Sequence, residues 1–245
     1  MTNFGLIGKS LSHSFSKTYF EKKFNDLNLI NHTYQNFELN TIFEIENVLK
    51  TPNLKGLNVT NPYKEVIIPF LDELTADAKQ IGAVNCIKIS NEKTIGYNTD
   101  FYGFAQSIKP FLEPQHNKAL ILGTGGAAKA VEYALKNIGV EVYFVTSSAV
   151  KKNNTTFFYN ELNNHIFNAF KLIVNTTPVG LFPNINDAPK IPYNLITANH
   201  LCYDLIYNPS ETLFLKKAKE QGALIVNGYS MLQLQAEKSW EIWNL

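Results

Sequence analysis

The stretch Lys118–Lys129 constrains the fold more than any other part of the chain. It opens with Ala119–Leu122, an apolar run that is too short for a helix and is typical of a buried parallel strand. A glycine-rich turn follows, and apolar residues then recur at helical spacing as far as Ile138. A second apolar run, Val140–Val145, starts directly after Gly139. Strand, turn, helix and strand in this order predict a parallel βαβ unit.

The turn itself indicates a dinucleotide site. Gly123, Gly125 and Ala128 fit the fingerprint G-x-G-x-x-[GA]. The first glycine allows the tight turn, the second lets the backbone approach a pyrophosphate, and the alanine lets the helix pack on the strand. The start of the helix also offers unpaired N–H groups to phosphates. Because this unit begins near the middle of the chain, the first hundred residues must form something else.

Length and composition narrow the class of protein. The 245 residues suit one large or two modest domains, and the net charge of +1 comes without a basic stripe of the kind that nucleic acid requires. The two cysteines fit neither a disulfide framework nor a metal site by their spacing. No secretory signal pattern and no apolar run of membrane-spanning length occurs. We expect a soluble, cytoplasmic protein that binds no nucleic acid, membrane or metal.

Alternating strand and helix patterns predict an α/β first domain with a mostly parallel or mixed sheet. Its expected strands are residues 4–7, 32–37, 54–59, 81–89 and 93–97. Pro62 is placed to occupy the first turn of a helix, where its missing N–H costs nothing. A region with Pro110 and Pro114 marks the link into the dinucleotide unit.

The second half continues the same alternation. Expected strands are residues 157–159, 172–174, 201–205 and 224–226. Ser210 is expected to N-cap the helix that precedes the last of these strands. A final helix holds Met231, Gln235, Trp240 and Trp243, and packing is the expected role of both tryptophans.

Polar side chains gather where the predicted strands of the first half end. They are Ser14, Ser16, Asn58, Thr60, Lys64, Asn85 and Asn98–Asp100. Ligands of open α/β sheets bind outside the carboxyl ends of the strands, so these hydroxyls, amides, one ammonium and one carboxylate suit a small polyhydroxylated ligand. A Lys–Asp pair beside a dinucleotide site suggests proton transfer coupled to hydride transfer, because reduction of a ketone needs a proton donor. Taken alone, Lys64 is simply a solvated lysine, and Asp100 serves equally well as the N-cap of the helix that follows it.

A series of spaced motifs runs along almost the whole chain. In order they are Gly8-x-x-x-x-His13-Ser14-x-Ser16, Asn58-Val59-Thr60-x-Pro62-x-Lys64, Gly82-Ala83-Val84-Asn85, Gly96-x-Asn98-Thr99-Asp100, Gly123-x-Gly125-Gly126, Asn175-x-Thr177-Pro178-x-Gly180, Asp204-x-x-Tyr207-x-Pro209 and Gly228-x-x-Met231-Leu232-x-x-Gln235. In this order and spacing the chain resembles the shikimate dehydrogenase family. It departs from the family at Cys86, where threonine is usual.

The resemblance implies reversible NADP-linked reduction of 3-dehydroshikimate to shikimate, in the pathway to chorismate and the aromatic amino acids. It implies Lys64 as the acid/base and Asp100 as its partner. The implied substrate-binding residues are Ser14, Ser16, Thr60, Asn85, Tyr207 and Gln235. The implied cofactor-binding residues are Gly123, Gly125, Gly126, Ala127, Thr146, Ser147, Lys151, Thr176, Gly228 and Met231.

The resemblance also implies two domains. Residues 1–101 would bind substrate together with a returning helix at 229–245, and residues 102–228 would form a Rossmann-type, doubly wound NADP-binding domain. Oligomeric state stays open between monomer and homodimer.

The cofactor site departs most from the family, whose NADP-dependent members commonly carry an arginine after the second strand of this domain. Here Thr146-Ser147-Ser148 follows that strand, and the chain has no arginine. An acidic residue that would favour NAD is also missing there. Lys151 and Lys152 offer point charges without the bidentate grip of arginine, so we expect a modest preference for NADP.

Two alternatives remain open from the sequence. One is a relative that acts on quinate or a similar hydroxylated acid, with NAD as the cofactor. The other is a regulator of the same fold that binds nucleotide or metabolite without turnover. The presence of both Lys64 and Asp100 argues against the second.

Overall fold

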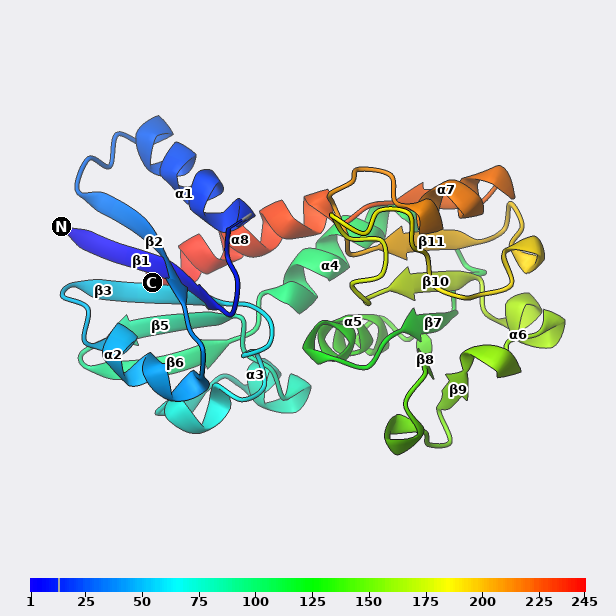
Figure 1. Cartoon of the computed structure of the whole chain (residues 1–245), viewed down its shortest axis with the longest axis horizontal. Coiled ribbons are helices and arrows are strands. Elements are labelled where there is room, and N and C mark those ends of the chain that lie inside the picture. Colours follow the sequence, from blue (N-terminus) through cyan, green and yellow to red (C-terminus); the bar gives the residue numbers. More distant parts are fainter. Residues whose placement is uncertain (13) are drawn as a thin grey trace. The chain divides into compact units, whose positions relative to one another are not determined.

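The structure is a computed structural model that describes residues 1–12 and 14–245. His13, part of the predicted substrate loop, lies outside the described residues. The chain divides into two compact units, coloured blue to cyan and green to orange in Figure 1, with the last residues in red. The first unit comprises Met1–Thr99 and Ala236–Leu245, and the second unit comprises Asp100–Gln235. The assignment of substrate and NADP to separate domains, with the boundaries given above, stays a prediction.

The first unit is built on a six-stranded mixed sheet with the order β2-β1-β3-β5-β6-β4. Strands β2, β1 and β3 are parallel, whereas β5 is antiparallel to both of its neighbours. The strands are β1 (Thr2–Gly8), β2 (His32–Glu38), β3 (Leu54–Val59), β4 (Glu73–Leu74), β5 (Cys86–Ser90) and β6 (Lys93–Tyr97). The helices are α1 (Phe15–Asp26), α2 (Ile45–Leu49) and α3 (Ala76–Ile81), with 3₁₀ turns η1 (Ile42–Glu44) and η2 (Ile68–Phe70). The predicted mixed α/β sheet is confirmed.

Two hydrophobic clusters cover the two faces of this sheet. One packs under α1 and the end of the last helix, and the other packs under α2 and α3 (Figure 1). Successive side chains of a strand point to opposite faces, so Leu6 belongs to the first cluster and Ile7 to the second. The sheet is therefore buried on both faces, which leaves its strand ends as the place for polar side chains.

The helix predicted to start at Pro62 does not form. Residues 61–67 are irregular turns, and the first helical residue after them is Ile68 in η2. The carbonyl of Lys64 accepts a hydrogen bond from the backbone N–H of Val84 at 2.7 Å. A carbonyl used by a distant segment is not available to the next helical turn, so tertiary pairing overrides the local signal.

The strand predicted at residues 81–89 begins only at Cys86. Ala76–Ile81 is instead α3, which Thr75 N-caps, because the Thr75 hydroxyl accepts from the N–H of Ala78 at 3.3 Å. Gly82 ends this helix in the left-handed conformation at φ 70°, where glycine costs least.

The last helix, α8 (Tyr229–Trp243), ends in the first unit. Trp243 stacks on Phe4 with ring centroids 4.8 Å apart, and its indole N–H donates to the carbonyl of Ile87 at 3.0 Å. Ala236 and Trp243 are buried in the same cluster as Phe4. The predicted return of the C-terminal helix to the first unit is confirmed, and Trp243 packs as expected.

The second unit holds a six-stranded, entirely parallel sheet with the order β12-β11-β10-β7-β8-β9. Counted from β7, this order reads 6-5-4-1-2-3, the order of the dinucleotide-binding fold. The strands are β7 (Lys118–Leu122), β8 (Glu141–Thr146), β9 (Thr156–Phe158), β10 (Leu172–Asn175), β11 (Leu201–Asp204) and β12 (Leu224–Val226). The helices, besides the start of α8, are α4 (Asp100–Ile108), α5 (Gly126–Lys136), α6 (Asn164–Ala169) and α7 (Leu213–Glu220). The remaining 3₁₀ turns are η3 (Lys109–Phe111), η4 (Ala149–Lys151), η5 (Tyr159–Glu161) and η6 (Tyr193–Leu195).

Helices cover both faces of this sheet, as a doubly wound fold requires. Helices α4 and α5 bury Phe104, Ala128 and Val131 in one cluster, whereas α6 and α7 bury Phe167 and Phe214 in the other. The expected close packing of α5 on the sheet at Ala128 is thus present. The predicted Rossmann-type, doubly wound domain is confirmed.

One predicted cap in this unit is wrong. Helix α7 is capped by Thr212 rather than by Ser210, because the Thr212 hydroxyl accepts from the N–H of Leu215 at 3.3 Å. The same hydroxyl donates to the buried Asp204 at 2.6 Å, and this second bond fixes which residue caps the helix.

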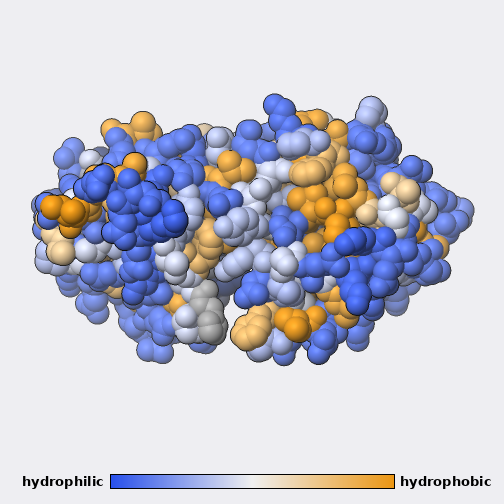
Figure 2. Space-filling model, turned by 90° about the horizontal axis from the view of Figure 1, so that it is seen from above, coloured by the Kyte–Doolittle hydropathy of each residue, from blue (hydrophilic) through white to orange (hydrophobic). Residues whose placement is uncertain are grey.

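No helix among residues 1–12 and 14–245 has the length and apolar character needed to span a bilayer. The face shown in Figure 2 is mostly hydrophilic, with apolar residues gathered over part of the second unit.

The contact between Gly56 and Trp243 yields a stability prediction. A Cβ at Gly56 would lie 2.2 Å from the indole Nε1 of Trp243, a rigid ring that cannot rotate away. We expect Gly56→Ala to lower the free energy of unfolding by about 1 to 3 kcal/mol, as overpacking does in cores. Urea unfolding measures the change. The double variant Gly56→Ala/Trp243→Phe should lose less than the sum of the two single changes, and strict additivity would contradict the proposed clash.

Candidate active site

The loop between β1 and α1 leads to the predicted substrate residues Ser14 and Ser16 and is called the serine loop. Side chains of β2 hydrogen-bond to Leu11 in this loop. The backbone N–H of Leu11 donates to Glu38 Oε1 at 2.6 Å, and Asn36 Nδ2 donates to the carbonyl of Leu11 at 3.1 Å. Ser14 then N-caps α1, since its hydroxyl accepts from the N–H of Lys17 at 3.5 Å. These contacts fix the two ends of the loop that carries the predicted substrate serines.

Ser16 is half-buried, and its side chain lies close to the phenol of Tyr34. Tyr34 is 2% exposed, and burial raises its pKa well above the ordinary value. The phenol is therefore neutral at physiological pH and donates its proton to Asn58 Oδ1 at 2.8 Å. Tyr34 links a predicted substrate residue to the centre of the sheet.

Asn58 lies near the carboxyl end of β3 and is 4% exposed. Besides accepting from Tyr34, its amide donates to the carbonyl of Asn85 at 3.3 Å and to the hydroxyl of Ser239 at 2.9 Å. Thr60 follows β3 directly and is half-buried, with its N–H bonded to the carbonyl of Ile7 at 2.9 Å. The end of β3 is thus fixed from three directions.

Lys64 lies in the turns after β3 and is half-buried. Its backbone is tied to Val84, as described above, and Val84 immediately precedes Asn85 in the chain. The neighbouring Tyr63 donates its hydroxyl proton to the carbonyl of Leu39 at 2.5 Å. The two predicted motifs that carry Lys64 and Asn85 are therefore adjacent in the first unit.

Asn85 is oriented by Thr99. The backbone N–H of Thr99 donates to Asn85 Oδ1 at 2.5 Å, and Asn85 Nδ2 donates to the Thr99 hydroxyl at 3.0 Å. The neighbouring Asn98 donates to the carbonyl of Ala83 at 2.9 Å. Asp100 follows in the chain as the first residue of α4, in the second unit, and is 6% exposed. It therefore lies inside the helix rather than at the position of an N-cap.

The glycine turn of the second unit has the geometry that its sequence predicts. Gly123 has φ 102°, and a Cβ there would lie 2.9 Å from the hydroxyl oxygen of Thr176. Gly125 N-caps α5, and a Cβ on it would meet nothing within 4 Å. Gly126 and Ala127 begin the helix. The turn thus presents open backbone at the start of a helix, where a pyrophosphate binds in this fold.

Thr176 belongs to the loop after β10, beside the turn. Its N–H and hydroxyl both bond to the carbonyl of Leu122, at 3.0 and 2.6 Å. Asn175 holds the next residue, because its Oδ1 accepts from the N–H and the hydroxyl of Thr177 at 3.1 and 2.7 Å. This loop lies at the switch point of the sheet, between β7 and β10, where ligands of the fold collect.

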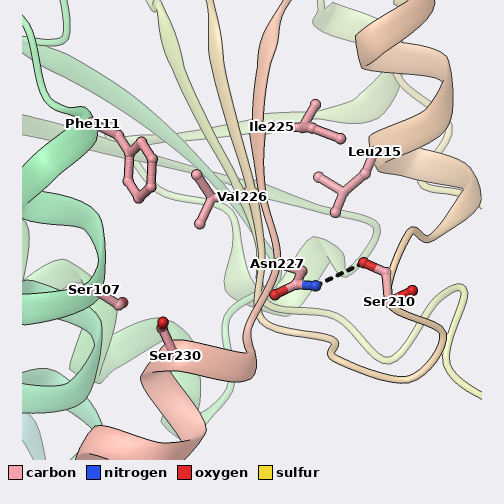
Figure 3. A pocket seen from close by; sticks show the side chains of 8 residues that line it. All are labelled: Ser107, Phe111, Ser210, Leu215, Ile225, Val226, Asn227 and Ser230. Atoms are coloured by element: carbon pink, nitrogen blue, oxygen red, sulfur yellow. Dashed lines mark hydrogen bonds between the residues drawn. The ribbon is translucent and has the colours of Figure 1, made fainter.

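The backbone of Gly228 lies too close to Leu205 for a side chain at position 228. A Cβ at Gly228 would lie 2.0 Å from the carbonyl oxygen of Leu205. Asn227 fixes the preceding turn by donating to the carbonyl of Ser210 at 2.8 Å, beside a pocket of about 330 Å³ (Figure 3). Met231 is only 7% exposed and packs in the core, so little of it is open to a ligand.

Two predicted substrate residues also lie in the second unit. Tyr207 is half-buried in the loop after β11, and burial raises its pKa. Gln235 is 8% exposed on α8, and its Nε2 donates to the carbonyl of Leu232 at 2.9 Å.

The end of β8 offers a single exposed lysine. The Thr146 hydroxyl is buried and accepts from the N–H of Ser148 at 3.1 Å, whereas Ser147 and Lys151 are exposed. Lys152 forms an ion pair with Glu161 and lies over the Phe158 ring at 4.7 Å. Of these two lysines, Lys151 is thus the more exposed.

Reasoning from the sequence missed two buried residues that support these loops, Tyr34 and Ser239. Of these, only Ser239 carries a sequence signal, since it lies one helical turn after Gln235 on the same face of α8. Asp204 begins one of the motifs, but the sequence assigns it no role. No group of acidic, histidine and cysteine side chains among the described residues is arranged to hold a metal ion.

The fold and these loops define a class: two-domain α/β proteins with a dinucleotide-binding unit and a separate mixed-sheet unit rich in buried amides and hydroxyls. Residues 6–87 match the family model described as shikimate dehydrogenase substrate binding domain. A relative from Methanococcus aeolicus named shikimate dehydrogenase (NADP(+)) is 39% identical over 98% of this chain and 90% of its own length.

Solved structures agree with this relative. The crystal structure of shikimate dehydrogenase from Aquifex aeolicus has a TM-score of 0.88 and 38% identity, over 100% of this chain and 92% of that one. The enzyme from Thermus thermophilus, solved with NADP(H) and shikimate, has a TM-score of 0.87 and 28% identity, over 99% of this chain and 93% of that one. The chain belongs to the shikimate dehydrogenase family.

Asp204 is the one buried carboxyl of the second unit that the predicted mechanism does not use. It accepts from Asn175 Nδ2 at 3.0 Å, from the N–H of Ile206 at 3.1 Å and from Thr212 at 2.6 Å. Burial raises its pKa to about 7, although these three hydrogen bonds oppose the shift. It joins the loop after β10, the loop after β11 and the start of α7.

This shift predicts how stability depends on pH. An unfolded aspartate has a pKa of 3.8, so between about pH 4 and pH 7 the folded protein keeps a proton that the unfolded chain releases. The stability that the protonated Asp204 carboxyl contributes to the folded protein is fully present below about pH 4 and is lost as the pH rises through about 7. Wild type should lose about 2.7 kcal/mol more stability than Asp204→Asn between pH 5 and pH 8, because about two pH units lie between pH 5 and this pKa, at 1.36 kcal/mol per unit.

Urea unfolding of both proteins at the two pH values measures this difference. Asp26→Asn removes an exposed carboxylate of α1 and serves as the matched control, with the same pH dependence as wild type expected. An equal difference for Asp204→Asn and Asp26→Asn would contradict the raised pKa.

Proposed function

We propose that this chain is an NADP-dependent shikimate dehydrogenase, which reversibly reduces 3-dehydroshikimate to shikimate in the pathway to chorismate and the aromatic amino acids. The observation that carries the proposal is the similarity, over almost the whole chain, to relatives named for this activity and cofactor. The order of the motifs along the chain and the buried amide and hydroxyl groups of the first unit support it. As part of the proposal, the enzyme is cytoplasmic and works as a monomer or homodimer.

Lys64 and Asp100 are the proposed catalytic residues. NADPH, when bound, supplies the hydride that reduces the ketone. The carbonyl oxygen then becomes an alkoxide and needs a proton, which the ammonium of Lys64 donates. Asp100 is the proposed partner that orients this ammonium. In the reverse direction, Lys64 takes the proton from the hydroxyl that is oxidised.

The substrate is a carboxylate that carries several hydroxyls, and the proposed site offers matching groups. Ser14, Ser16, Thr60, Asn85, Tyr207 and Gln235 are proposed to bind it. Hydroxyl and amide groups both donate and accept hydrogen bonds, so they suit a polyhydroxylated ring better than apolar side chains do. Specificity of this kind is strong, because a missing hydroxyl leaves a buried polar group unpaired.

NADP is proposed to bind the second unit. The backbone of Gly123, Gly125, Gly126 and Ala127 receives the pyrophosphate, with Thr176 beside the turn. Gly228 and Met231 are proposed to lie near the nicotinamide. Thr146, Ser147 and Lys151 are proposed to lie near the 2′-phosphate, where Lys151 supplies the charge.

An assay of NADP⁺ reduction with shikimate tests the function. Wild-type protein should turn over shikimate, and Lys64→Ala should lower kcat by about 10²- to 10⁴-fold, the range for loss of a general acid, with a much smaller change in KM. Asp100→Asn should lower kcat and raise KM. Lys55→Ala, an exposed lysine of β3, is the matched control and should behave as wild type.

The same assay separates the alternatives. Faster turnover of quinate, or with NAD⁺, would indicate the related quinate activity. Tight binding of shikimate without turnover would indicate a regulator. Near-normal kcat in Lys64→Ala would contradict the assigned acid/base.

The cofactor preference forms a separate prediction. We expect kcat/KM to favour NADP⁺ over NAD⁺ by a modest factor that shrinks as salt rises, because an exposed lysine is screened. Lys151→Ala should narrow the preference by about two- to fivefold, the scale of an exposed ion pair, and Ser147→Arg should widen it.

Lys152→Ala is the matched control, since Glu161 already engages that ammonium, and it should change the preference less than Lys151→Ala. A kcat/KM for NAD⁺ equal to or above that for NADP⁺ at low salt would show that the cofactor assignment is wrong.

A further inference from the structure

Ser239 is a completely buried hydroxyl on the C-terminal helix, with 0% of the residue exposed. Its oxygen accepts from Asn58 Nδ2 at 2.9 Å and lies 3.3 Å from the hydroxyl of Thr99. The thiol of Cys86 hydrogen-bonds to it as well. Burying a hydroxyl costs free energy unless it is hydrogen-bonded, so the hydrogen bonds to these partners offset the cost of burying Ser239.

The partners of Ser239 lead in one direction to the serine loop. Asn58 is held at both ends of its amide, by Ser239 at Nδ2 and by Tyr34 at Oδ1. The side chain of Ser16 lies close to the Tyr34 phenol. A rotation of the Asn58 amide would break the bonds on both sides, so the position of Ser16 depends on Ser239 through two intermediates.

In the other direction the partners lead to Asn85. The Thr99 hydroxyl receives a hydrogen bond from Asn85 Nδ2, and the Thr99 N–H fixes Asn85 Oδ1. This pattern decides which end of the Asn85 amide is the donor. Ser239 therefore stands between two residues of the proposed substrate site, Ser16 and Asn85, and all of these groups belong to the first unit.

We propose that Ser239 is a positioning residue for shikimate, which holds Asn58 and Thr99 so that Ser16 and Asn85 meet the substrate in one arrangement. Tyr34 is its counterpart on the other side of Asn58. Hydrogen-bonded networks of this kind, when every member is satisfied, rigidify a core and select one arrangement of it. The inference rests on the proposed function, because it names shikimate as the ligand.

The test compares Ser239→Ala with Ser107→Ala, a matched loss of a buried serine in the second unit. Ser107 is 5% exposed and bonds to Tyr203 and to the carbonyl of Phe104, at 2.7 and 2.9 Å. Both variants should lower the thermal midpoint. Only Ser239→Ala should raise KM for shikimate, by about tenfold for one lost buried hydrogen bond, with KM for NADP⁺ unchanged.

Two further variants sharpen the result. Ser239→Cys keeps the size and a weak hydrogen-bonding group, so it should restore part of the affinity. Tyr34→Phe should also raise KM for shikimate. Because both residues act through Asn58, the double variant Ser239→Ala/Tyr34→Phe should raise it by less than the product of the single effects.

An unchanged KM for shikimate in Ser239→Ala, or an equal rise in Ser107→Ala, would overturn the positioning role. A strictly multiplicative double variant would show that Ser239 and Tyr34 do not act through Asn58. The wild-type protein in the same assay tests the proposed function separately. Absence of turnover and of shikimate binding there would overturn both proposals, whereas wild-type turnover with normal KM in Ser239→Ala would overturn only this one.

Discussion

Buried polar side chains at the carboxyl ends of strands are the constraint on which both proposed sites depend. A buried amide or carboxyl must be hydrogen-bonded, so it fixes the groups around it. In the first unit, Asn58 on β3 and Asn85 just before β5 tie the strand ends to Thr99 and α8. In the second unit, Asn175 and Asp204 end β10 and β11 and tie the loops that follow. Each loop is therefore held by the strand that it leaves.

The second constraint is the close packing of other residues against the backbone, which is possible where glycine has no side chain. Gly123 lets Thr176 lie close to the glycine turn, and Gly228 lets the carbonyl of Leu205 approach the backbone. In both places a side chain would collide with groups of the same unit, so these glycines shape the loops whether or not a nucleotide is bound. Gly125 differs, because a Cβ there would meet nothing in the protein. Its openness is what a ligand that binds against the backbone requires.

The sequence was sufficient for the elements whose signals are local and periodic. The βαβ unit, the parallel sheet and the returning helix follow from apolar spacing, glycine turns and motif order. The predictions that were wrong concern places where a residue distant in the sequence determines the local structure. The carbonyl of Lys64 bonds to Val84, so no helix forms at Pro62, and Asp204 selects Thr212 over Ser210 as a cap. The hydrogen-bonded network around Ser239 could not be predicted from the sequence for the same reason, because its members are up to 181 residues apart in the chain.

The hydrogen-bonded network around Ser239 in the first unit differs from the one around Asp204 in the second unit in how its groups titrate. Apart from Tyr34 and Cys86, the network around Ser239 consists of amides and aliphatic hydroxyls, which do not titrate. Burial holds the pKa of Tyr34 well above its usual value and raises that of Cys86 to about 12. No group of this network therefore changes its charge between about pH 6 and pH 9. Over that range, a pH dependence of shikimate turnover would report groups outside this network.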